Sequence, residues 1–143
     1  MRAVDSNVLI YAFLSDSEFH QQAKTVVSAL ATAAAPWAIP WACVHEFYGV
    51  VTRRSLFPAG PSPVHAVAQL DEWFRSPSLQ LLSESRNHWQ TLVGLVASSE
   101  ISGPLIHDAK IAAICLDHGV TEFITVDRDF RRFAALRVRS LLN

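Results

Sequence analysis

Short apolar runs alternate along the chain with longer segments whose apolar residues recur every three or four positions. Such runs are typical of buried strands, and the longer spacing is typical of amphipathic helices. We therefore expect strands over residues 2–5, 37–39, 79–82 and 123–126, with a fifth over 136–140 at the sheet edge. Helices are expected over residues 8–14, 18–34, 41–53, 64–74 and 87–99, and from the breaker at 102–104 to 118.

Strands that alternate with helices favour an α/β fold, because parallel strands need crossover connections and are covered on both faces. We expect three layers, α/β/α, with a central parallel sheet of four to five strands. Ligands of such sheets bind beyond the carboxyl ends of the strands. Asp5 and Asp127 each end a predicted strand, so both are expected at that edge.

The bulk properties narrow the class of protein. A length of 143 residues fits one domain, residues 1–143, and half of the residues are hydrophobic, enough for a core without disulfides. The net charge of -1 excludes a uniformly cationic nucleic-acid binder. Cys43 and Cys115 are far apart among apolar neighbours, which predicts buried free thiols and suits a reducing cytoplasm.

No membrane segment is expected. Residues 25–44 carry no charge and are long enough to cross a bilayer, but Pro36 and Pro40 interrupt them. Asp5 interrupts the early apolar stretch, so no signal peptide is expected either.

Two acids lie on apolar stripes of predicted helices. The positions three and four residues from Glu46 are Ala42, Cys43, Gly49 and Val50, and those around Asp108 are Pro104, Leu105, Ile111 and Ala112. An acid of a solvated helix normally lies opposite the stripe. Both carboxylates are therefore expected on inward-facing surfaces.

Each of the four acids also has a local explanation. Asp5 suits a helix cap, Asp108 a charge near a helix N-terminus, and Asp127 a turn before Arg128. Glu46 suits a pair with a buried arginine. Four separate explanations are needed, whereas one shared site explains all four residues.

Converging carboxylates repel one another, and a hard divalent cation removes that repulsion. Mg²⁺ and Mn²⁺ prefer oxygen ligands, lower the pKa of bound water and neutralise charge on a phosphodiester. Zinc is less suitable, because the six histidines show no HxxxH or HExxH spacing. Metal-assisted phosphodiester hydrolysis is the leading chemistry.

Four stretches carry a family resemblance. Residues 1–9, MRAVDSNVL, resemble the opening of PIN domains, and His45-Glu46-Phe47 resembles their second acidic motif. Residues 107–113, HDAKIAA, resemble the third motif, and residues 125–130, TVDRDF, resemble the fourth. Each motif alone is weak, but the ordered set covers essentially the whole chain. The nearest group is the VapC toxins of bacterial toxin–antitoxin pairs.

The resemblance implies a Mg²⁺- or Mn²⁺-dependent endoribonuclease that forms a homodimer, is inhibited by a VapB-type antitoxin, and has a sheet ordered 3-2-1-4-5. It carries over an acidic quartet, with Asp5 and Asp108 as the main metal-holding pair, Asp127 completing the sphere, and Glu46 as a ligand or general base. The accessory candidates are Ser6, Asn7, Thr125 and Asp129.

A basic tail and four tryptophans are further candidates for contacts. Arg128, Arg131 and Arg132 follow Asp127 and suit RNA phosphates, although a solvated face explains them equally well. For Trp37, Trp41, Trp73 and Trp89 we favour core packing, and an exposed one is expected at a dimer or antitoxin contact.

Other readings of the acids remain. A receiver domain needs paired acids after its first strand, and a haloacid-dehalogenase phosphatase needs a second Asp where Asn7 stands, so both are disfavoured. A PIN-like nuclease of structured DNA is disfavoured because the compact chain shows no extra elements. The main alternative is a catalytically inactive PIN-like scaffold that binds RNA or protein.

Overall fold

The structure is a computed structural model that describes residues 1–142. A five-stranded, all-parallel sheet forms its centre. Its strands are β1 (Arg2–Val4), β2 (Trp37–Pro40), β3 (Leu79–Leu82), β4 (Glu122–Thr125) and β5 (Val138–Ser140). Their order is β3-β2-β1-β4-β5, which confirms the predicted order, and β5 forms one edge.

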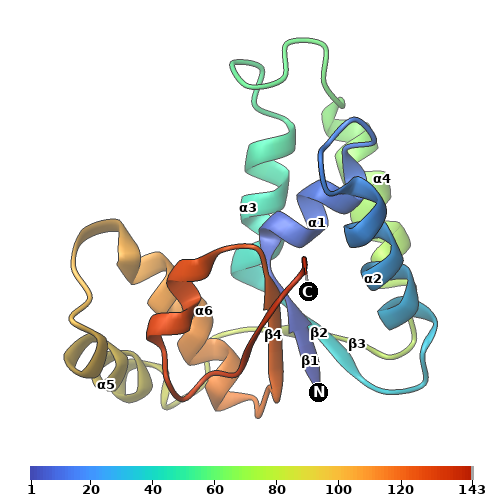
Figure 1. Cartoon of the computed structure of the whole chain (residues 1–143). Helices are drawn as coiled ribbons and strands as arrows, with labels where there is room; N and C mark the ends of the chain where they lie inside the picture. Colours follow the sequence, from blue (N-terminus) through green and yellow to red (C-terminus); the bar gives the residue numbers. More distant parts are fainter. Residues whose placement is uncertain (143) are drawn as a thin grey trace.

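Helices cover the sheet, and together with the central sheet they form three layers, α/β/α (Figure 1). They are α1 (Ser6–Phe13), α2 (His20–Thr32), α3 (Trp41–Val51), α4 (Pro63–Phe74), α5 (His88–Ser99) and α6 (Ile106–Asp117). Two short 3₁₀ helices, η1 (Gly103–Leu105) and η2 (Arg128–Arg132), precede α6 and follow β4. The helix predicted over residues 18–34 is shorter at both ends, but the predicted α/β/α class is confirmed.

Local chemistry sets several of the helix ends. Asp5 caps α1, and the Ser62 hydroxyl caps α4, whose first residue is proline. Gly119 follows α6 with φ +68°, a left-handed conformation that glycine adopts at little cost. The predicted stop after residue 118 is therefore observed.

The core lies between the sheet and its helices. The inner strands bury Ala3, Val4, Ile39 and Ile124 almost completely. Cys43 and Cys115 are buried and free, as predicted. Trp37 and Trp73 also lie in the core, but Trp41 and Trp89 are 37% and 68% exposed, so the core prediction is wrong for these two.

Within residues 1–142, no helix combines the length and the apolar character that a membrane span requires.

The carboxyl ends of β1 and β4 lie side by side. The two strands pair in parallel from Arg2 and Glu122 onward, and the backbone N–H of Asp5 donates to the carbonyl of Ile124 at 3.0 Å. Whatever follows these strands therefore emerges at one edge of the sheet. This arrangement brings the segments that contain Asp5 and Asp127 together.

Candidate metal centre

Asp5 is the buried member of the predicted site, with 4% of its surface exposed. Its Oδ1 accepts the backbone N–H of Ser6 at 2.7 Å. Its Oδ2 accepts the Thr125 hydroxyl at 2.6 Å and the Asn7 amide at 2.8 Å. Both oxygens are therefore already engaged by the protein.

Thr125 and Asn7 join the end of β4 to the start of α1. The Thr125 hydroxyl oxygen accepts the Asn7 amide at 3.0 Å and the backbone N–H of Asp127 at 2.9 Å. The Asn7 side-chain oxygen accepts the N–H of Val126 at 3.3 Å. These bonds fix the geometry of Asp5 relative to Asp127, so Asn7 and Thr125 position the acids.

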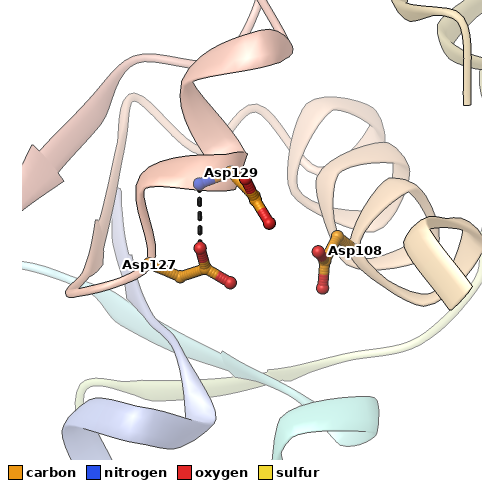
Figure 2. Close-up of side chains that lie close together, drawn as sticks. All are labelled: Asp108, Asp127 and Asp129. Atoms are coloured by element: carbon orange, nitrogen blue, oxygen red, sulfur yellow. Dashed lines mark hydrogen bonds between the residues drawn. The ribbon is translucent and has the colours of Figure 1, made fainter.

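Three further acids lie close to one another. Asp108 comes from the first turn of α6, Asp127 follows β4, and Asp129 lies in η2. One carboxylate oxygen from each of the three lies within 4.8 Å of the other two. Figure 2 shows the three side chains facing a common space, with the Asp129 N–H donating to Asp127 Oδ1 at 2.8 Å.

The protonation behaviour links Asp5 and Glu46 to the three acids. The pKa of Asp108 is raised to about 6, chiefly by burial and also by the charges of Asp127, Asp129 and Glu46, while the charge of Arg132 lowers it. The pKa of Asp5 is also raised to about 6, and burial is the largest cause. Hydrogen bonds from Thr125 and Ser6 lower that pKa, and the charges of Glu46 and Asp108 raise it. The predicted quartet thus occupies one electrostatic neighbourhood.

The sequence prediction for Glu46 is wrong in one respect. Glu46 is exposed, because the buried stripe of α3 runs through Cys43, Val44, Phe47 and Val51. The small residues near Glu46, including Gly49, resemble a stripe in sequence but lie at the surface. Within residues 1–142, Glu46 forms no ion pair, so the local alternative weighed for it, a pair with a buried arginine, is wrong.

The local roles weighed for the other acids are present. Asp5 caps α1, Asp108 stands in the first turn of α6, and Asp127 caps η2 through the Asp129 N–H. None of these roles requires Asp108 to face Asp127. The convergence of the carboxylates is therefore an additional property of the fold.

Two features of the site were not predicted from the sequence: the place of Asp129 in the acid cluster and the contact between Cys43 and Asp5. Asp129, expected as an accessory residue, belongs to the most compact group of acids. The Cys43 thiol lies 3.8 Å from Asp5 Oδ1, and burial raises its pKa well above the usual value, so it stays protonated and donates. The sequence signal that could have indicated this contact is the position of Cys43 on the apolar stripe of α3, three residues before Glu46.

The donor set fits a hard divalent cation. The compact group offers carboxylate oxygens only, with no histidine or cysteine among its three members. Oxygen donors of this kind suit Mg²⁺ or Mn²⁺ and suit zinc less well. Asp108, Asp127 and Asp129 are the residues that would hold the ion.

The chain and its fold are similar to known proteins. The profile of the PIN domain family matches residues 2–136. Ribonuclease VapC43 of Mycobacterium tuberculosis is 32% identical over 143 residues, which covers 100% of this chain and 97% of the relative. Ribonuclease VapC31 of the same organism is 31% identical, covering 96% of each chain.

Solved structures show the same fold. VapBC2 from Rickettsia felis, bound to a promoter DNA fragment, aligns with a TM-score of 0.71 at 17% identity, covering 97% of each chain. VapC20 of Mycobacterium tuberculosis, described as a sarcin–ricin loop cleaving toxin, aligns with a TM-score of 0.69 at 19% identity, covering 96% of this chain and 99% of that one. With the profile match and the full-length relatives, these findings establish that the chain belongs to the PIN domain family.

Proposed function

We propose that residues 1–143 act as one metal-dependent endoribonuclease domain, the toxin of a VapBC-type toxin–antitoxin pair. The single observation that carries the proposal is the convergence of Asp108, Asp127 and Asp129, with one carboxylate oxygen of each within 4.8 Å of the other two. The names of the full-length relatives, VapC ribonucleases, support RNA as the substrate. The two buried free thiols suit action in a reducing cytoplasm.

We propose Mg²⁺ or Mn²⁺ as the cofactor. When bound, such an ion activates water and offsets negative charge on the scissile phosphate. Asp108, Asp127 and Asp129 would hold it, and Asp5, which is near enough for the charge of Asp108 to raise its pKa, adds a fourth negative charge. Thr125, Asn7 and Ser6 keep the Asp5 carboxylate in place through the hydrogen bonds described above.

Glu46 is assigned as the general base. Its carboxylate is exposed on α3, yet its charge acts on both Asp5 and Asp108. An exposed carboxylate with no ion-pair partner in residues 1–142 is available to accept a proton from attacking water. A Glu46→Gln variant keeps the size of the side chain and removes this acceptor.

A VapB-type antitoxin is the proposed protein partner. A groove of about 1000 Å³ runs between the α1–α2 connection, the loop before α4, and α4 itself. Its apolar wall includes Phe13, Leu14, Leu56 and Phe57. The loop before α4 lines this groove from Leu56 to Pro61. Homodimer formation stays a prediction, with the exposed Trp41 and Trp89 as candidate contacts.

Cleavage of a mixed RNA pool tests the activity. We expect cleavage by the purified protein with Mg²⁺ or Mn²⁺, and none with EDTA. Asp108→Asn is expected to abolish cleavage, whereas Asp71→Asn, an exposed acid on α4, is the matched control and is expected to keep it. RNA binding without cleavage under every metal condition would favour the non-cleaving scaffold and contradict the nuclease.

A further inference from the structure

Three separate faces follow from the period of η2. A 3₁₀ helix has about three residues per turn, so side chains three positions apart project in the same direction. Phe130 and Phe133 form the buried face, with 1% and 0% exposure. Asp129 and Arg132 form the second face, toward Asp108. Arg128 and Arg131 form the third.

The second face pairs its arginine internally. The Arg132 Nε donates to the carbonyl oxygen of Asp129 at 3.1 Å, and its Nη2 donates to Asp129 Oδ1 at 3.4 Å. Arg137 and Arg139, further along the tail, lie 3.9 and 3.6 Å from the Glu122 carboxylate. These three arginines are therefore partly neutralised by acids of the chain itself.

The third face borders a small cavity beside the acid cluster. The cavity has a volume of about 130 Å³ and lies between η2 and the ends of β4 and β5. Arg128 and Arg131 are its only cationic lining residues, and neither forms an ion pair within residues 1–142. Ser140 contributes a hydroxyl, and Asp127 forms the wall shared with the acids.

We propose that Arg128 and Arg131 form a subsite for one backbone phosphate of the RNA strand, next to the phosphate that is cleaved. The inference rests on the proposed function and makes it more specific. The negative charge of Asp127 repels an anion. One arginine would only offset the charge of Asp127, whereas two arginines leave a site with net positive charge. Arg132 has a different task, which is to hold Asp129 toward the cluster.

Salt-dependent RNA binding tests the division of the arginines. A fluorescein-labelled single-stranded RNA of mixed sequence is titrated in EDTA at several KCl concentrations. Each lost phosphate contact lowers the slope of log K against log salt by about 0.7, or about fivefold in affinity per decade of salt. We expect this loss for Arg128→Gln and Arg131→Gln. The control Arg137→Gln, an exposed arginine of the same tail, is expected to leave the slope unchanged.

A scan with neutral linkages locates the phosphate. Single methylphosphonate substitutions are placed at successive positions of an RNA whose cleavage site has been mapped. At the position beside the cleavage site, we expect the neutral linkage to weaken binding to the wild type but not to Arg128→Gln/Arg131→Gln. Equal weakening in both proteins at every position would overturn the subsite.

The outcomes separate the two proposals. A wild type that cleaves RNA while both arginine variants bind with unchanged slopes overturns the subsite and leaves the nuclease intact. A wild type that neither binds nor cleaves RNA in Mg²⁺ contradicts the nuclease, and the subsite with it.

Discussion

Asp5 and the group of Asp108, Asp127 and Asp129 are both acidic, but the protein treats them in opposite ways. Asp5 is buried and accepts hydrogen bonds on both oxygens. The other three are partly or fully exposed, and their oxygens face one another across a common space (Figure 2). Asp5, the most buried acid, thus has the oxygens least available as metal ligands, and the three more open acids are the better candidates for holding an ion.

This difference assigns separate tasks to the two regions. Replacing an acid whose oxygens are engaged leaves donors without partners, which costs stability. Replacing an acid that mainly faces other acids relieves their repulsion, so it costs little stability in metal-free protein. The same change removes an oxygen ligand, so it weakens metal binding instead. Substitutions in the two regions should therefore separate stability from activity.

The largest effect on stability is expected from Asp5→Ala. The change leaves the Thr125 hydroxyl, the Asn7 amide and the Ser6 N–H without their acceptor, so we expect the free energy of unfolding to fall by about 2–4 kcal/mol. The matched change Asp108→Ala is expected to cost no more than about 0.5 kcal/mol in metal-free protein. Urea unfolding in EDTA measures both. Equal losses in the two variants would remove the distinction between the regions.

Asp129→Asn tests whether the third acid is more than accessory. The backbone N–H of residue 129, which donates to Asp127 Oδ1, remains, so the local turn is kept. We expect RNA cleavage to fall about 10- to 100-fold, with weaker Mn²⁺ binding by calorimetry. Asp71→Asn is the control. Unchanged cleavage and metal affinity would return Asp129 to a structural role.

Thr125→Val tests the hydrogen bonds that join Asp5 to the segment containing Asp127. The isosteric change removes the donor to Asp5 and the acceptor for Asn7 and Asp127, at a cost of about 1–2 kcal/mol. The pKa of Asp5 is expected to rise above about 6, because the Thr125 bond lowers it. Carboxyl NMR titration and urea unfolding measure the two effects. A comparable loss from Thr52→Val, at the C-cap of α3, would argue against a special connection.

The smallest effect concerns pH. Asp5 and Asp108 have a pKa of about 6, raised from 3.8, so the folded state binds protons more tightly than the unfolded state. Metal-free stability should therefore fall as pH rises from about 4 to about 6. Asp108→Asn should flatten this fall by less than about 1 kcal/mol, since Asp108 is only half-buried and partly screened by solvent. A steeper fall in the variant would contradict the assignment.

The sequence predicted the strand-end acids because parallel strands direct their carboxyl ends to one edge. It predicted the exposure of Glu46 incorrectly, because Ala42, Gly49 and Val50 are apolar in type but small and partly exposed. It also left Asp129 as accessory. The placement of Asp129 depends on a single 3₁₀ turn after β4, and a turn that short has too few residues to show its period clearly.

Mn²⁺ binding at neutral pH tests the central claim most directly. Isothermal titration of the wild type is predicted to show saturable binding, and the triple variant Asp108→Asn/Asp127→Asn/Asp129→Asn is predicted to show none. If the wild type fails to bind Mn²⁺, or the triple variant binds it equally well, the three facing carboxylates are not a metal centre.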